Sequence, residues 1–113
     1  MAKPSFNIGH KVTLDVLLLS LPGVTAGKMF GYPAYYTNKK LFACVYGDGV
    51  GVKIPAALAE QLLERPQVVP FQPLGKSWMR EWVQINHGDS EDYRKEMEVF
   101  RASVTFVGSL SKR

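Results

Sequence analysis

Residues 41–54 read LFACVYGDGVGVKI, which is two runs of strand-forming residues joined by a short glycine turn. Because glycine tolerates the positive φ that tight hairpins need, Gly47-Asp48-Gly49 predicts a reversal between antiparallel strands. In the second run, apolar residues alternate with Gly51 and Lys53. This alternation predicts a strand with one face on the core, within an antiparallel meander.

Further strands are expected on both sides of this hairpin. Runs rich in strand formers occupy Lys28–Phe30 and Ala34–Thr37, and the Asn38-Lys39 pair after them is a second hairpin signal. A fifth strand is predicted over Met79–Ile85. It follows a proline-rich stretch, residues 67–74, that is expected to stay extended and non-helical.

The first segment, about residues 8–20, is predicted to be a helix. It carries Val12, Val16 and Leu19 at helical spacing, with further leucines beside them. This spacing predicts that the helix is buried through that apolar set. Pro22-Gly23 then ends the segment.

Two more helices are expected later in the chain. Pro55 suits the first turn of a helix over Ala56–Arg65, and Pro66 ends that helix. Asp89 is a good N-cap for the last helix, which carries one apolar stripe. The stripe consists of Tyr93, Met97, Phe100, Val104 and Val107.

The order of these segments is α-β-β-β-β-α-β-α. It predicts an α+β fold with a largely antiparallel sheet of about five strands. Helices are expected at the N-terminus, in the middle and at the C-terminus. No repeat or polar linker divides the sequence, so residues 1–113 are expected to form a single domain.

Composition narrows the class of protein. The 113 residues are 46% hydrophobic and 21% charged, which is typical of a globular domain rather than a disordered chain. One cysteine excludes an internal disulfide framework. The longest apolar stretch, residues 12–21, is about half the length of a membrane span, and the N-terminus lacks a secretory signal. A cytoplasmic protein with no membrane contact is therefore expected.

Six short blocks follow one another along the chain. They are MFG (residues 29–31), YYTNKKLFA (35–43), VYGDG (45–49), VKIP (52–55), PFQPLG (70–75) and MREWV (79–83). In kind and order they resemble the TfoX N-terminal domain family over about residues 24–107. The likeness is to the stand-alone versions, without the further C-terminal domain of the competence regulator. Lys39 departs from the family, which often has glycine there.

The resemblance implies a small α+β fold similar to the YjbR-like and secretion-chaperone-like domains. It implies no established catalytic residues, although members are linked to the regulation of DNA uptake and transcription. Fold-level likeness alone does not transfer a function. The prediction is a non-catalytic interaction or regulatory module that binds a protein partner or a second copy of itself, and that needs no cofactor or metal ion.

Nucleic-acid binding is a second hypothesis. The net charge is +4, and the excess lies in residues 1–53. Aromatic side chains interleave with lysines there, as in platforms on which single-stranded bases stack. The alternative is that the aromatics fill the core and the lysines form a solvated face. The candidate anion-binding surface consists of Lys28, Lys39, Lys40 and Lys53.

The last helix has more apolar residues than one stripe requires. Val99, Phe106 and Leu110 lie roughly 100–140° from the main stripe. This flank is predicted to form the subunit interface of a homodimer. The alternative is that the first helix and the proline-rich stretch cover it.

Two other side chains that could be reactive, those of Cys44 and His87, are given structural roles. Cys44 is predicted to lie on the same side of its strand as Phe42 and Tyr46, as an inert packed thiol. His87 is predicted to be a turn residue that bonds to the backbone. A third hypothesis is an unrecognised enzyme or a small-ligand protein, for which an apolar pocket between the proline-rich stretch and the sheet is the expected site.

Overall fold

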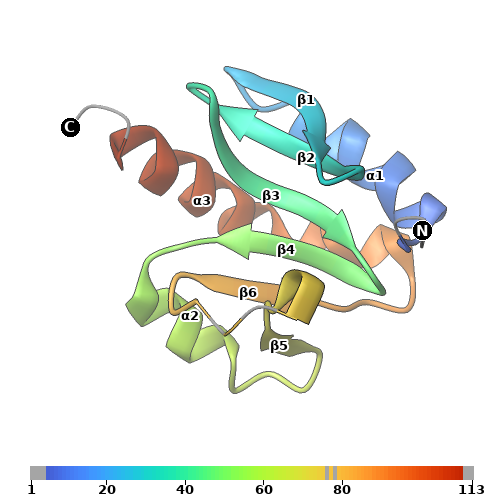
Figure 1. The fold of residues 1–113 in the computed structure, drawn as a ribbon, viewed down its shortest axis with the longest axis vertical. Coiled ribbons are helices and arrows are strands. Elements are labelled where there is room, and N and C mark those ends of the chain that lie inside the picture. The colour runs from blue at the N-terminus through green and yellow to red at the C-terminus, as the bar shows by residue number, and fades with distance from the viewer. Residues whose placement is uncertain (1–4, 76, 78, 111–113) are drawn as a thin grey trace.

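The computed structural model describes residues 5–75, 77 and 79–110. At its centre is an antiparallel sheet in the order β1-β2-β3-β4-β6-β5 (Figure 1). The strands are β1 (Val24–Met29), β2 (Tyr32–Thr37), β3 (Lys40–Tyr46), β4 (Gly49–Lys53), β5 (Val68–Pro70) and β6 (Trp82–Ile85). The helices are α1 (Ile8–Leu18), α2 (Ala56–Leu62) and α3 (Met97–Leu110), with 3₁₀ segments η1 (Pro73–Gly75) and η2 (Ser90–Glu96).

The α+β class and the three helix positions are confirmed, but the sheet has a sixth strand. The additional strand is β5, which pairs with β6 in the register Val68↔Ile85. Residues 67–74 were expected to be extended without pairing. A strand of three residues at the sheet edge has too few positions to show an alternating pattern, and its final proline suits an edge.

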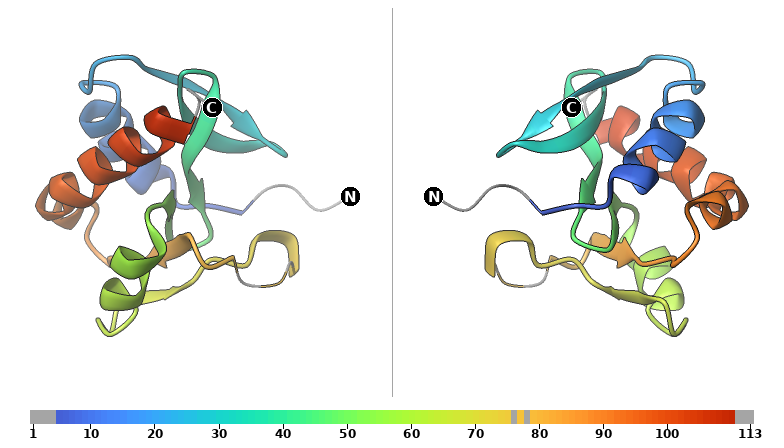
Figure 2. Two further views of the ribbon diagram at one scale, coloured as in Figure 1. Left: turned by 90° about the vertical axis from the view of Figure 1, so that its left-hand side faces the viewer. Right: turned by 90° about the vertical axis from the view of Figure 1, so that its right-hand side faces the viewer.

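The two faces of the sheet are covered differently. Figure 2 shows α1, α2 and α3 on one side, which we call the first face, and η1 on the other side, the second face. The first face carries the main core. Its most deeply buried members, none more than 1% exposed, include Leu14, Leu18, Phe42, Val45, Val50, Val52, Ile54, Val83, Ile85, Tyr93 and Phe100.

A β-bulge in β3 corrects one prediction about strand faces. Tyr35 pairs with Ala43 and Tyr36 pairs with Leu41, so Phe42 is left over between them. A bulge shifts the alternation by one residue. Phe42 therefore enters the main core on the first face, while Cys44 lies on the second face and not beside Phe42.

The orientation of α1 is also different from the prediction. Val12, Val16 and Leu19 are 58%, 59% and 43% exposed. The opposite side of the helix packs into the protein. The prediction was wrong because α1 is apolar on both sides, and residue spacing alone does not show which side is buried. The buried residues are His10, Thr13, Leu14, Leu17 and Leu18.

The last helical region starts after the predicted N-cap, but its first turns are a 3₁₀ helix rather than an α-helix. The Asp89 side chain accepts a hydrogen bond from the Glu91 N–H at 2.9 Å, and residues 90–96 form a 3₁₀ segment before α3 starts. Tyr93, Phe100 and Val107 of the predicted stripe are buried. None of the helices in the described part of the chain is long and apolar enough to cross a bilayer.

Candidate functional site

The second face carries a smaller apolar cluster, which we call the second-face cluster. Strand alternation supplies it, since every other residue of a strand that feeds the main core points to this side. Its buried members are Ala34, Cys44, Phe71 and Trp82, and its half-buried members are Met29, Tyr36, Leu41 and Tyr46.

Phe71 closes the middle of this cluster because it lies directly against Gly51 of β4. A Cβ atom on Gly51 would be 2.7 Å from both Cε1 and Cζ of the Phe71 ring, well inside the distance at which carbon atoms pack. Phe71 also contacts Trp82, with 5.2 Å between ring centroids, and Tyr46 edge-on at 5.5 Å. The sequence Val50-Gly51-Val52 thus makes room for an aromatic ring on one face only.

A pocket of about 140 Å³ opens between this cluster and the segment that follows β5. The backbone N–H of Leu74 donates to the Tyr46 hydroxyl at 2.9 Å, which ties η1 to β3. The predicted apolar pocket between the proline-rich stretch and the sheet is therefore present. It is lined by Met29, Phe30, Leu41, Phe71, Pro73, Leu74, Met79 and Trp82.

Two lining residues have an unusual backbone. Phe30 has φ 50° and Leu74 has φ 56°, a left-handed region that costs a bulky L-residue roughly 1–2 kcal/mol. Their side chains are nevertheless 69% and 53% exposed. Phe30 stands in the β1–β2 turn before Gly31, where asparagine would suit the backbone better. Both strained positions therefore present large apolar side chains to solvent at one pocket.

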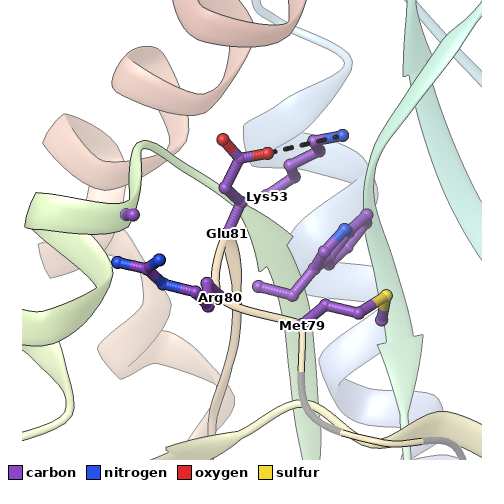
Figure 3. Close-up of a pocket in the computed structure, with 6 residues that line it drawn as sticks. Lys53, Met79, Arg80 and Glu81 are labelled. Carbon is purple, nitrogen blue, oxygen red and sulfur yellow. Dashed lines mark ion pairs between the residues drawn. The ribbon is translucent and has the colours of Figure 1, made fainter.

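An open, more polar cleft of about 510 Å³ adjoins the pocket (Figure 3). Met79 and Trp82 line both cavities. The Lys53 ammonium group lies 3.9 Å from a Glu81 carboxylate oxygen, and Arg80 is also part of the wall. The cleft thus offers charges of both signs next to an apolar recess.

The size of the pocket limits what it can hold. Sites for drug-sized ligands and cofactors measure about 300–1,000 Å³, whereas a cavity of about 150 Å³ takes a benzene ring. At about 140 Å³, this pocket fits one aromatic or branched aliphatic group. Among the described residues that line it, every side chain is apolar or aromatic, so none of these supplies an acid, a base or a nucleophile.

Cys44 is a fully buried member of the second-face cluster. Burial raises the pKa of its thiol to about 12, although a hydrogen bond with the Gly51 backbone acts in the opposite direction. At neutral pH the side chain is a neutral thiol and a poor nucleophile. This agrees with the inert packed thiol that the sequence predicted.

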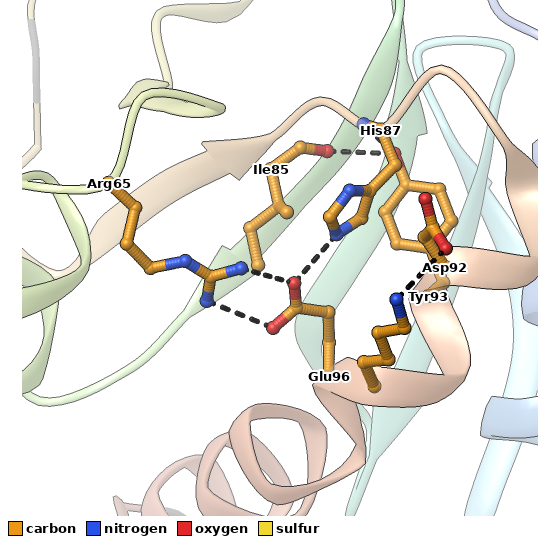
Figure 4. A network of polar contacts seen from close by, with 7 residues as sticks. Arg65, Ile85, His87, Asp92, Tyr93 and Glu96 are labelled. Atoms are coloured by element: carbon orange, nitrogen blue, oxygen red, sulfur yellow. Dashed lines mark hydrogen bonds and ion pairs between the residues drawn. The ribbon is translucent and has the colours of Figure 1, made fainter.

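A second polar cluster lies on the first face, around the Glu96 carboxylate (Figure 4). Arg65 donates to both oxygens of Glu96, at 3.1 and 2.6 Å, and His87 Nε2 lies 2.7 Å from Oε2. Glu96 is 3% exposed. The Tyr93 hydroxyl donates to the Ile85 carbonyl at 2.8 Å. These contacts join the turn after α2, the loop after β6 and η2.

Burial and the hydrogen bonds with Arg65 and His87 have opposite effects on the pKa of Glu96. Burial alone would raise the pKa of Glu96, but the hydrogen bonds from Arg65 and His87 outweigh it and hold that pKa below its usual value. The hydrogen bond to Glu96 raises the pKa of Arg65. Burial raises the pKa of Tyr93 to about 12. The cluster is a satisfied structural ion pair rather than an open reaction centre.

Sequence reasoning missed Glu96 and wrongly assigned the His87 side chain to backbone bonding, because its ring contacts the Glu96 carboxylate instead. The available signal was that Glu96 lies three residues after Tyr93 and four before Phe100, so it interrupts a buried stripe. A charged residue in such a position requires a buried partner. In the described part of the chain, no three His, Cys, Asp or Glu side chains are grouped so that they could hold a metal ion.

The candidate anion-binding lysines do not gather at one place. Lys39 and Lys40 lie in and after the β2–β3 turn. Lys28 lies two strands away from Lys40, on β1, and is displaced from it by four residues, which is about 13 Å along the strand direction alone. Lys53 forms an ion pair with Glu81. The nucleic-acid hypothesis stays a prediction, and the strand register does not strengthen it.

The predicted subunit interface on α3 is half-buried within the chain itself. Val99 and Phe106 pack against the main core, and Leu110 is of intermediate exposure. Their proposed role in a homodimer stays a prediction. More strongly exposed apolar side chains lie elsewhere, on α1 and around the second-face pocket.

Comparison with known proteins decides the family. The model of the TfoX N-terminal domain matches residues 16–106, which include every strand and the whole second-face pocket. This chain belongs to the TfoX N-terminal domain family. No curated protein and no solved structure matches it. The similarity of this TfoX N-terminal domain to YjbR-like and secretion-chaperone-like folds therefore stays a prediction.

Proposed function

We propose that this TfoX N-terminal domain is a non-catalytic interaction module that binds an apolar segment of a protein partner on the second face of its sheet. The observation that carries the proposal is the 140 Å³ pocket, rimmed by Phe30 and Leu74. A domain that only had to fold would be more stable with asparagine or glycine at these two positive-φ positions. Both positions keep a strained backbone and an exposed apolar side chain, and this combination supports a role in binding.

The shape of the surface favours a peptide over a compact small molecule. The pocket accommodates one large apolar side chain, while the adjoining cleft of about 510 Å³ is open enough for the chain on either side of it. Lys53, Arg80 and Glu81 in the cleft can pair with charges of either sign. One buried anchor beside a polar rim is the usual organisation of a protein–protein contact.

A non-catalytic role is supported by the chemistry of the pocket wall. Among the described residues that line it, no side chain carries an ionisable group or an activated hydroxyl. The thiol of Cys44, in the adjoining cluster, is fully buried, and burial keeps it neutral. A bound segment would therefore be held in the pocket and not chemically changed there.

The test is selection of a random peptide library displayed on phage against the full chain and two variants. Leu74→Asn removes an apolar rim residue but suits the positive φ, so it is expected to abolish enrichment while raising the free energy of unfolding by about 1 kcal/mol. The matched control is Val69→Asn, at a 38% exposed valine outside the pocket. It should enrich the same peptides as the wild type.

The expected sequences contain one large aromatic or branched aliphatic residue within a short polar context. Two results would contradict the proposal. One is that the wild type enriches no common sequence, and the other is that Leu74→Asn enriches the same peptides as the wild type. Urea unfolding of all three proteins shows whether any loss of binding comes from loss of the fold.

A further inference from the structure

Helix α1 has a second apolar side that the rest of the described chain leaves exposed. It consists of Ile8, Val12, Val16 and Leu19, which are 65%, 58%, 59% and 43% exposed. We call these four residues the α1 stripe. Helix α1 lies on the helical side of the sheet, opposite η1 (Figure 2).

The geometry of the helix separates this stripe from the buried side. At 100° per residue, the four side chains fall within an arc of about 80°, while Leu14 and Leu17 point in the opposite direction. A surface helix normally has one apolar side and one polar side, and a helix that is apolar on both is buried on both. The stripe therefore indicates a partner outside the chain.

We propose that a second copy of this chain covers the α1 stripe, with the two α1 helices packed antiparallel about a two-fold axis. Along the helix the stripe reads large, small, small, large, and this order is the same in both directions. Antiparallel packing sets Ile8 against the partner's Leu19 and Val12 against the partner's Val16. Such self-complementarity is what a two-fold contact requires, because the same patch serves both subunits.

The charges beside the stripe obey the same symmetry. Lys11 and Asp15 lie along one edge of it and form an ion pair at 2.6 Å within the helix. Asp15 is held in place by the Tyr35 hydroxyl, which donates to it at 2.6 Å. The two-fold axis lies level with the midpoint between Ile8 and Leu19. The positions of Lys11 and the partner's Asp15 along the helix axis then differ by only about 1.5 Å. Each lysine then faces an opposite charge across the contact.

The area of this contact sets the expected strength of the dimer. The 11 residues of α1 span only about 16 Å, so one pair of helices buries less than the roughly 800 Å² per partner of a standard interface. The association is therefore expected to be weak and to depend on concentration. This surface is separate from the peptide pocket, and the proposal does not rest on the proposed function.

The first test is sedimentation equilibrium of the full chain from about 1 μM to 1 mM. The apparent mass is expected to rise from 12.6 kDa toward twice that value. The double variant Val12→Glu/Val16→Glu should stay monomeric throughout, and the control Val69→Glu should dimerise like the wild type. A wild-type chain that is monomeric at 1 mM, or a double variant that still dimerises, overturns the proposal. The latter result would favour another surface, such as the α3 flank.

The second test reports the direction of the two helices. Antiparallel packing holds residue 8 near the partner's residue 19, whereas two copies of residue 8 are about 16 Å apart. Mixing Ile8→Cys and Leu19→Cys chains under mild oxidation should therefore give a disulfide-linked dimer that neither variant forms alone. Cys44 does not interfere because it is fully buried. Equal cross-linking by Ile8→Cys alone would contradict the antiparallel arrangement.

Discussion

The two faces of the sheet begin from the same strands and end as different environments. Helices α1 and α3 close the first face, where Phe42, Phe100 and their neighbours are fully buried. The second face is closed by a short segment after β5, with Phe71 as its main buried residue. On the second face, a small apolar pocket coincides with strained residues at its rim.

The difference follows from what covers each face. A helix satisfies its own backbone hydrogen bonds and lays a continuous apolar side on the sheet. The segment of residues 71–75 has no such internal ladder, and η1 is held by a bond from Leu74 to the Tyr46 hydroxyl. We infer that the first face supplies most of the stability and the second face supplies the binding surface.

Removing one phenylalanine from each face should separate these roles most strongly. Phe100→Ala is expected to lower the free energy of unfolding by about 4 kcal/mol, because the helices around it cannot collapse into the cavity. Phe71→Ala should cost about 3 kcal/mol or less, since the segment that carries it can move toward the sheet. Urea unfolding measures both. An equal or larger loss for Phe71→Ala would contradict the comparison.

The ion pair on the first face should make stability depend on pH. Glu96→Gln is expected to cost about 2 kcal/mol at pH 7, because Arg65 loses its buried partner. The folded-state pKa of Glu96 is lowered, so its contribution is complete above the unfolded value near 4.3 and is lost as the pH falls through the folded value. Urea unfolding should show the difference between wild type and variant shrinking from pH 7 to pH 3. A difference that stays constant would show that Glu96 acts through packing alone.

The smallest expected effect concerns the contact between Gly51 and Phe71. Gly51→Ala adds a methyl group 2.7 Å from the ring and should cost about 1 kcal/mol, while it pushes Phe71 toward the pocket. The matched control is Gly88→Ala, where an added Cβ meets nothing within 4 Å. Chemical denaturation gives the stabilities, and NMR shifts at Trp82 report the ring. If the two alanine variants behave alike, the close approach at Gly51 is unimportant.

Sequence reasoning succeeded where the signal was local. The turn at residues 47–49, the alternation in β4 and the cap at Asp89 each depend on a few neighbouring residues, and the structure contains all three. An apolar pocket between the proline-rich stretch and the sheet was also expected, as the site that the third hypothesis would use. Its depth and its lining depend on contacts between segments far apart in the chain.

The failures have a common physical cause. On α1, Val12 and Leu14 are both apolar, and only packing on the sheet selects which side is buried. In β3, the bulge at Phe42 arises from pairing with β2 and leaves no mark in the local pattern. Glu96 was overlooked because its partner Arg65 is 31 residues away.

By itself, the amino-acid sequence determined the family, the α+β class and the order of the three helices and of every strand except β5, since strand alternation, turn glycines and helix caps act over a few residues. Only the tertiary structure decided which apolar surfaces are covered and which stay open. It left the α1 stripe exposed and opened the pocket beside Phe30 and Leu74. These outcomes depend on how whole elements pack, and packing is a property of distant residues brought together.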